Sequence, residues 1–231
     1  MKGLRTALLS AFVAFASTQK VQVLPLGDSI TDICCWRSFA WREISQAGLA
    51  DQVDFVGSVT GIPARCDAPS GFDANHEGHS GWQAYDIAKN NIDAWMRQSS
   101  PDVVHVLLGT NDINIGKRDA TTIVGAYTSL LSSMRTANPN VTVIMATIIP
   151  MRWDDATAAA VNKQLPAWVQ QHNTTQSPIY LADISKTTGF TTNMLQGDGI
   201  HPTTQGDQVI ASRVAPLIIN AVEFVLARRL N

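Results

Sequence analysis

The sequence predicts an α/β fold in which a parallel β-sheet lies between layers of helices. Short apolar segments rich in β-branched residues recur along the chain, and longer segments of helical composition separate them. The apolar segments show little alternation of polar and apolar residues, which is typical of strands covered on both faces. Strands that alternate with helices favour parallel pairing, because the helix returns the chain to the starting edge of the sheet.

Five segments are expected to be strands and five to be helices. The expected strands are 21–26, 53–56, 103–108, 141–146 and 179–182. The expected helices are 36–47, 84–97, 120–137, 156–171 and 205–229. Gly48 follows the first helix, where glycine commonly ends a helix. Residues 60–80 are rich in Gly, Pro, Asp and Asn, so we expect a surface loop, and loops of that length generally serve a site.

The chain of 231 residues is long enough for one domain with a packed core. We predict a signal peptide over residues 1–16, because Lys2 and Arg5 precede an apolar segment that is too short to span a bilayer. A single domain then covers residues 17–231. The alternative is that the N-terminal segment forms the first helix of the fold. We expect no transmembrane helix elsewhere.

The formal net charge of −2, without a Lys/Arg cluster, argues against binding to nucleic acid or to an anionic membrane. Three cysteines fit an extracellular protein with one disulfide and one spare thiol. Either Cys34 or Cys35 is expected to pair with Cys66, because a bridge between neighbouring cysteines is strained. Glycosylation sequons begin at Asn140 and Asn173, which agrees with a secretory route.

A candidate nucleophile directly follows the first expected strand, where residues 27–31 read Gly-Asp-Ser-Ile-Thr. Ligand sites of parallel sheets gather beyond the carboxyl ends of the strands, so Ser29 lies where a nucleophile would be placed. Helix-forming sequence follows, and its N–H groups can point at the serine oxygen. The alternative is an ordinary turn in which Asp28 and Thr31 act as caps.

A carboxylate and an imidazole lie three residues apart near the other end of the chain, where residues 198–201 read Asp-Gly-Ile-His. Asp198 can hold Nδ1 of His201 and fix its tautomer, which leaves Nε2 to accept the proton of Ser29. The three groups are those that an activated serine nucleophile needs. Taken alone, this segment more often indicates a surface turn in which Asp198 bonds to local backbone and His201 precedes a helix.

Acyl transfer also needs hydrogen-bond donors for an oxyanion. Residues 109–112, Gly-Thr-Asn-Asp, follow the strand expected at 103–108, and Asn111 can offer its side-chain amide. Gly81 ends the long loop and can present its N–H to the same oxygen, because no Cβ blocks the approach. The alternatives are an Asx turn at Asn111 and a glycine at position 81 that only ends the loop.

These four segments, in this order, resemble the SGNH (GDSL-type) hydrolases over nearly the whole length after the predicted signal peptide. The resemblance implies a flavodoxin-like three-layer α/β/α sandwich with a central five-stranded parallel sheet. It implies ester hydrolysis by Ser29, Asp198 and His201. It further implies an oxyanion hole made by the Ser29 N–H, the Gly81 N–H and the Asn111 side chain. This chemistry requires no cofactor.

Residues 75–82, Asn-His-Glu-Gly-His-Ser-Gly-Trp, resemble carbohydrate esterase family 3 more narrowly. Members of that family remove acetyl groups from xylan, which implies a secreted serine esterase for an acetylated polysaccharide, expected as a monomer. One alternative is a lipase, thioesterase or lysophospholipase of the same superfamily with an apolar acyl channel. A second is a carbohydrate-binding protein without turnover. An α/β-hydrolase is disfavoured because no Gly-x-Ser-x-Gly elbow occurs.

Three tryptophans lie near the expected strand-end loops and are possible substrate contacts. Trp36, Trp82 and Trp153 could each stack on a sugar ring, although aromatic residues more often fill a core. His105 lies inside an expected strand and is predicted to be a packed core residue. His172 lies at a helix end and needs no function.

A metal site is not expected. Asp73, His76, Glu77 and His79 are ligand types, but their spacing differs from the His-Glu-x-x-His pattern that places two histidines on one helical face.

Overall fold

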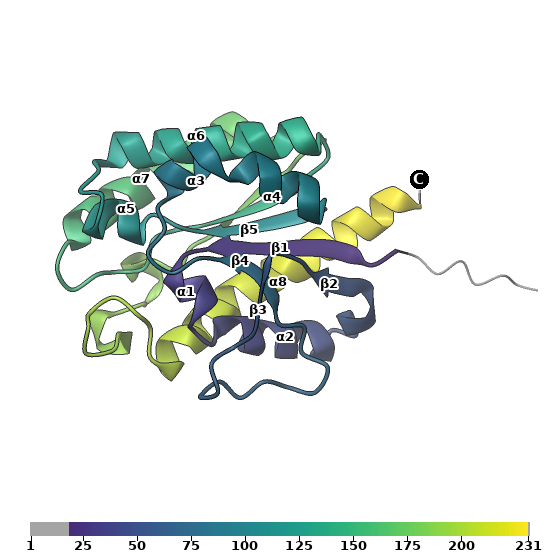
Figure 1. Cartoon of the computed structure of the whole chain (residues 1–231), viewed down its shortest axis with the longest axis horizontal. Coiled ribbons are helices and arrows are strands. Elements are labelled where there is room, and N and C mark those ends of the chain that lie inside the picture. Colours follow the sequence, from purple (N-terminus) through teal and green to yellow (C-terminus); the bar gives the residue numbers. More distant parts are fainter. Residues whose placement is uncertain (1–18, 231) are drawn as a thin grey trace, which may run out of the picture.

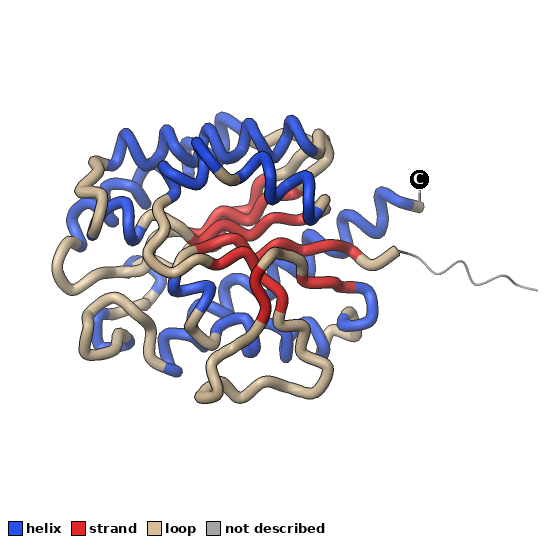
Figure 2. Tube along the Cα trace, viewed as in Figure 1, coloured by secondary structure: helices blue, strands red, loops and turns tan. Residues whose placement is uncertain are grey.

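A seven-stranded sheet runs through the molecule with helices on both faces (Figures 1 and 2). This computed structural model describes residues 19–230, so the predicted signal peptide lies outside the described residues. The strand order is β3-β4-β1-β5-β6-β7, and β2 also pairs with β1. The strands are β1 (Val21–Gly27), β2 (Val53–Phe55), β3 (Val59–Thr60), β4 (Asn75–Gly78), β5 (Val103–Leu107), β6 (Thr142–Ala146) and β7 (Ile179–Ala182).

The three-layer α/β/α class is confirmed, and the sheet has two strands more than expected. Both extra strands involve the segment predicted as a loop. β4 pairs in parallel with the last residues of β1, and β3 pairs antiparallel with β4. The polar side chains of His76 and Glu77 concealed β4 in the sequence, although both are buried in the structure.

β2 and β4 share one edge of β1. β2 pairs with the first half of β1, Val21 to Val23, whereas β4 pairs with Leu26 and Gly27 at its carboxyl end. β4 therefore extends the sheet up to the point where β1 ends. This arrangement brings the chain that follows β4 next to Ser29.

Two helices cover one face of the sheet and four cover the other (Figure 1). The first layer holds α2 (Trp36–Gln46) and α8 (Thr204–Arg229). The second holds α3 (Ala84–Asn90), α4 (Ile92–Ser99), α6 (Ala120–Ala137) and α7 (Asp155–His172). The short elements are α1 (Ser29–Asp32), α5 (Thr110–Asn114), η1 (Ala50–Gln52), η2 (Lys186–Thr188) and η3 (Thr192–Met194).

The expectation of one helix over 84–97 is wrong, because the chain breaks at Asn91. Asn91 has φ −128° and ψ −40°, outside the helical geometry, and it both ends α3 and precedes α4. The remaining predicted helices lie within a residue or two of their observed bounds. Gly48 follows α2 with φ +75°, the left-handed conformation expected there.

α8 is long and apolar enough to cross a membrane by length and composition alone, which corrects the expectation that no such segment follows the N-terminus. Its buried residues include Ile210, Val214, Ile218 and Val222, which belong to the hydrophobic cluster on the α2 side of the sheet. This packing is that of the core helix of a globular domain.

Two links tie the irregular part of segment 61–74 to the start of α2. Cys35 forms a disulfide with Cys66, while Cys34 is free and buried. The fully buried guanidinium of Arg37 donates to the carbonyls of Thr31, Gly61 and Ala74. These links hold a segment with little regular structure against the residues that follow Ser29.

A third link joins the beginnings of α2 and α8. The carboxyl of Asp207, in the first turn of α8, accepts hydrogen bonds from the N–H groups of Cys35 and Trp36 at the start of α2. Burial raises the pKa of Asp207 to about 7, against the lowering effect of these bonds and of Arg65.

Candidate active site

Ser29 lies at the carboxyl end of β1, at the first residue of α1. The Asp28 side chain caps this short helix by accepting from the Ile30 N–H at 2.9 Å. A Cβ on Gly27 would lie 2.1 Å from Oγ1 of Thr31, so only glycine allows so tight an exit from the strand. Ser29 is 8% exposed, so it is nearly buried at the sheet edge.

The structure brings the three side chains expected to act together into one hydrogen-bonded chain. Nε2 of His201 lies 2.8 Å from Oγ of Ser29, and Nδ1 lies 2.7 Å from Oδ2 of Asp198. Oδ1 of Asp198 accepts from the N–H groups of Ile200 and His201 at 2.9 and 3.0 Å. Both carboxylate oxygens are thus engaged, and the imidazole is oriented toward the serine.

The charge of Asp198 suits this arrangement. Partial burial raises the pKa of its carboxyl, but hydrogen bonds from Ile200 and His201 outweigh burial and place the pKa below its usual range. An ionised carboxylate keeps the proton of a neutral imidazole on Nδ1, which leaves Nε2 free to accept the hydroxyl proton of Ser29.

The loop after β6 braces the turn that carries Asp198. The Arg152 N–H donates to the carbonyl of Gly199 at 3.0 Å, and Nη1 of Arg152 donates to that of Gly197 at 3.1 Å. The indole N–H of Trp153 donates to the carbonyl of Asp198 at 3.2 Å. Three successive carbonyls of the turn are therefore held by two neighbouring residues. Gly199 has φ +72°, and a Cβ there would lie 2.7 Å from Cβ of Arg152.

Three donors remain candidates for the predicted oxyanion hole. Within residues 19–230, the N–H groups of Ser29 and Gly81 donate to no partner. The Gly78 N–H, in contrast, is engaged by Nδ1 of His76, which favours Gly81 as the donor. Nδ2 of Asn111 donates to the carbonyl of Trp82 at 3.0 Å, and its second N–H bond remains for a ligand.

Two neighbours of Asn111 fix its position. Gly109 has φ +112°, and a Cβ there would lie 2.5 Å from both the Tyr127 hydroxyl and Cδ1 of Ile148. Asp112 is fully buried and accepts from the N–H groups of Ala84 and Tyr85, at the start of α3. Sequence reasoning did not identify Asp112 as a positioning residue. The sequence signal that could have identified Asp112 is its place next to Asn111, directly after the strand expected at 103–108.

The segment that carries Gly81 is held by a buried carboxylate and by ring stacking. Glu77 accepts from the Ser58 hydroxyl and N–H at 2.6 and 2.8 Å and lies 2.6 Å from Nε2 of His79. The ring of His79 packs against those of Trp82 and Trp95, with centroids 4.7 Å apart in both cases. Ser58 was not identified from the sequence, because nothing local links it to Glu77.

The predicted tryptophan contacts differ in exposure. Trp153 is 72% exposed and Trp82 is 39% exposed, and both flank residues of the candidate site. The expectation for Trp36 is wrong: it is fully buried, with its ring 4.8 Å from that of His105. It begins α2, which packs its first turn into the core. His105 is a packed core residue as expected, and burial lowers its pKa to about 3.

The side chains considered for a metal are engaged in protein contacts. Asp73 accepts from the N–H groups of Phe55 and Asn75. His76 accepts from Gly78, and burial lowers its pKa to about 4. Together with the Glu77–His79 pair, these contacts give each of the four residues a structural role. Within the described part of the chain no group of three metal-ligating side chains comes together.

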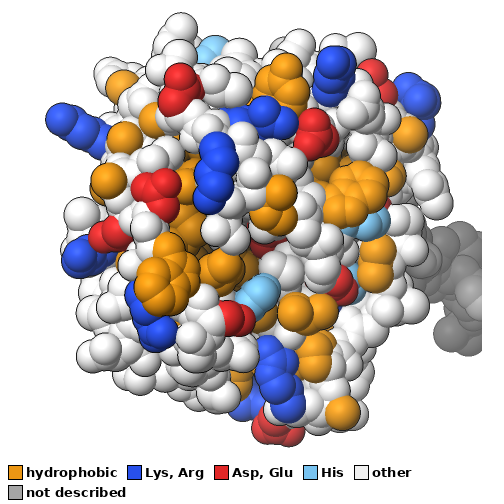
Figure 3. Space-filling view, turned by 60° about the vertical axis from the view of Figure 1, so that its left-hand side comes forward, with side chains coloured by type: hydrophobic (Ala, Val, Ile, Leu, Met, Phe, Trp, Pro, Cys, Tyr) orange, Lys and Arg blue, Asp and Glu red, His pale blue; other side chains and the backbone are white. Residues whose placement is uncertain are grey.

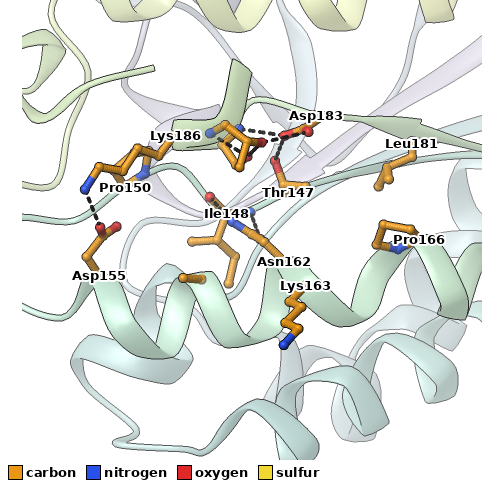
Figure 4. A pocket seen from close by; sticks show the side chains of 13 residues that line it. Thr147, Ile148, Pro150, Asp155, Asn162, Lys163, Pro166, Leu181, Asp183 and Lys186 are labelled. Atoms are coloured by element: carbon orange, nitrogen blue, oxygen red, sulfur yellow. Dashed lines mark hydrogen bonds and ion pairs between the residues drawn. The ribbon is translucent and has the colours of Figure 1, made fainter. Parts of the chain in front are cut away.

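The surface around the site is mixed in character. On the face shown in Figure 3, a histidine and an acidic side chain lie side by side, with hydrophobic side chains on either side of them. A cavity of about 520 Å³ lies apart from these residues, between α7 and the chain that follows β7 (Figure 4). Lys186 reaches toward Asp155 across one end of it, and Lys163 points away.

Comparison with known proteins places the chain among lipases and acylhydrolases. Residues 26–209 match the GDSL-like Lipase/Acylhydrolase family. A family 3 carbohydrate esterase from Talaromyces cellulolyticus is 54% identical, with a TM-score of 0.87 over 88% of this chain and 98% of that one. An acetyl esterase mutant solved with an acetate ion is 53% identical, with a TM-score of 0.88 over 89% and 99%.

Two further proteins are similar at lower identity. A family 3 carbohydrate esterase from Clostridium thermocellum is 29% identical, with a TM-score of 0.72 over 90% of this chain and 99% of that one. A curated protein from Acetivibrio thermocellus, named "Putative endoglucanase X", is 29% identical over 53% of this chain and 52% of its own length. The chain spans about half the length of that curated relative.

Proposed function

Because the chain belongs to the GDSL-like lipase/acylhydrolase family and is an esterase of the SGNH type, we propose that it is a secreted serine esterase that removes acetyl groups from an acetylated polysaccharide such as xylan. The observation that carries this proposal is the chain of hydrogen bonds from Asp198 through His201 to Ser29, at 2.7 and 2.8 Å. The acetyl substrate is supported by the similarity to an acetyl esterase and to family 3 carbohydrate esterases.

The geometry suits a two-step acyl transfer. His201 accepts the proton of the Ser29 hydroxyl while Oγ attacks the acetyl carbonyl. The N–H groups of Ser29 and Gly81 and the amide of Asn111 stabilise the oxyanion. The imidazolium, stabilised by Asp198, protonates the departing sugar oxygen. Water activated by His201 then releases acetate and restores Ser29.

Secretion is supported by the disulfide between Cys35 and Cys66, because such bonds persist in oxidising compartments. We further propose Trp82 and Trp153 as substrate contacts, since both are exposed beside the site. A sugar ring can pack its C–H face on an indole, and the rest of the polysaccharide then lies along the surface.

The proposal is tested with a substrate series on the wild type and on Ser29→Ala. We expect acetate release from acetylated xylan, and hydrolysis of p-nitrophenyl esters that falls steeply from acetate to butyrate and octanoate. Ser29→Ala should lose both activities while keeping its circular dichroism spectrum and melting temperature. A preference for octanoate over acetate would indicate a lipase-type enzyme instead.

A further inference from the structure

A hollow of about 320 Å³ opens beside the candidate oxyanion hole, and Gly81 belongs to both. The hollow lies where the segment after β4 meets the break between α3 and α4. Its lining combines one aromatic ring, one carboxylate and three side-chain amides, contributed by Trp82, Asp86, Gln83, Asn90 and Asn91. This volume lies at the lower end of the range for small-molecule sites.

The amides around the hollow are not used by the fold. Asn91 is the N-cap residue of α4, yet its side chain makes no capping hydrogen bond. Within residues 19–230, the side chain of Asn90 also has no hydrogen-bond partner. Oε1 of Gln83 is buried and unpartnered. Buried polar groups are normally satisfied, so the Gln83 oxygen points to a ligand that supplies its partner, while the exposed Asn90 and the half-buried Asn91 are accessible to the same ligand.

Charge favours a neutral ligand. The cation nearest to Asp86 is Arg118, whose Nη2 lies 3.6 Å from the Asp86 carboxylate. The same guanidinium lies 4.0 Å from the ring centroid of Tyr85 and close to the buried Asp112. Arg118 is thus already neutralised, and no cation remains in the lining to attract an anion.

The indole of Trp82 is held in place. Its ring packs against that of His79, and its carbonyl accepts from Asn111, yet its side chain stays 39% exposed. A ligand that stacks on a preorganised ring loses little free energy in ordering it. Amides donate and accept at once, as do the hydroxyl groups of a sugar.

We propose that this hollow is a subsite for a neutral pyranose unit that neighbours the acetylated unit in the polysaccharide. Trp82 packs on the C–H face of the sugar, and Asn90, Asn91 and Asp86 bind its hydroxyl groups. This subsite rests on the proposed function, because it assumes that the acetyl group enters beside Gly81. It makes the enzyme prefer an ester on a chain of sugars over the same ester on a single sugar.

The test compares two substrates that differ only in chain length, an acetylated xylotriose and an acetylated methyl xyloside. The variants are Asn90→Ala/Asn91→Ala and, as a matched control on α7, Gln170→Ala/Gln171→Ala. We expect the ratio of kcat/KM between the longer and shorter substrates to fall about tenfold in the first variant. The control should keep the wild-type ratio. An unchanged ratio in Asn90→Ala/Asn91→Ala would overturn the subsite.

A binding measurement separates this proposal from the proposed function. Ser29→Ala protein is titrated with unacetylated xylotriose while tryptophan fluorescence is followed, with and without Asn90→Ala/Asn91→Ala. Binding that the asparagine substitutions weaken supports the subsite, even if the wild type deacetylates no polysaccharide. Deacetylation of xylan, with a titration that shows no binding or binding that the substitutions leave unchanged, rejects the subsite and leaves the esterase assignment standing.

Discussion

The indole N–H of Trp153 donates a hydrogen bond to the main-chain carbonyl of Asp198. An exposed aromatic side chain is thereby fastened to the turn whose carboxylate orients His201. The same turn receives two further bonds from Arg152. Trp153 is therefore exposed beside the Asp198–His201 pair and helps to hold that pair in position.

Trp153→Phe should lower kcat for p-nitrophenyl acetate about threefold to tenfold with little change in KM, because it removes one hydrogen bond and keeps an aromatic ring. Trp168→Phe is the matched control, since the indole N–H of Trp168, in α7, donates to Oγ1 of Thr128 in α6, away from the Asp198 turn. Steady-state kinetics on both variants check this. If kcat is unchanged in Trp153→Phe, the bond does not position Asp198.

Asn111→Ala should lower kcat by about two to three orders of magnitude, because it removes a donor to the oxyanion in the transition state. Asn114→Ala, on the same short helix, serves as the control and should be close to wild type. Kinetics with p-nitrophenyl acetate measure both. A rise in KM at constant kcat would assign Asn111 to substrate binding instead.

The stability of the protein should depend on the ionisation of Asp207. Its pKa is raised from 3.8 to about 7, so between these values the folded protein holds a proton that the unfolded chain has released. The contribution of this group to stability is therefore present below pH 3.8 and is lost as the pH rises through about 7, by at most about 1.4 kcal/mol per pH unit.

Asp207→Asn cannot ionise, and its free energy of unfolding relative to wild type should increase from pH 5 to pH 8. Urea unfolding at four pH values measures this difference. Asp51→Asn, at an exposed site in η1, should show no such trend. If the free energies of unfolding of wild type and Asp207→Asn change with pH in the same way, the raised pKa of Asp207 is contradicted.

The Cys35–Cys66 disulfide closes a loop over a sequence separation of 31. Cys66→Ser should lower the free energy of unfolding by roughly 2–4 kcal/mol, mainly because the unfolded chain regains freedom. Dithiothreitol should destabilise the wild type by a similar amount and should leave Cys66→Ser unaffected. If dithiothreitol also lowers the free energy of unfolding of Cys66→Ser, Cys34 takes part in a second thiol reaction and the effect is not due to the Cys35–Cys66 disulfide alone.

Apolar composition was sufficient to predict the three layers and the strands β1, β2, β5, β6 and β7, because these strands are buried mainly through apolar side chains of their own. It missed β4, because the buried carboxylate of Glu77 is satisfied by Ser58, which lies outside that strand. A polar strand of this kind cannot be distinguished from a loop until such partners are known.

The same limit applies to the candidate site. The sequence predicted the chain of Ser29, His201 and Asp198 that the structure forms, because a strand end and a close Asp–His spacing locate these residues. It could not separate Trp36 from Trp82 and Trp153, since exposure depends on which face of a helix or loop meets the core. Asp112 and Arg152 act through main-chain groups of distant segments, and sequence alone does not show such contacts.

The link between Asp207 and the start of α2 has a mechanical consequence. α2 begins shortly after Ser29, and α8 begins shortly after His201. The carboxyl of Asp207 links the first turns of α2 and α8. The Ser29 hydroxyl and the His201 imidazole therefore precede two helices that are fastened to each other. The separation between the Ser29 hydroxyl and the His201 imidazole therefore depends on how α2 and α8 pack against each other.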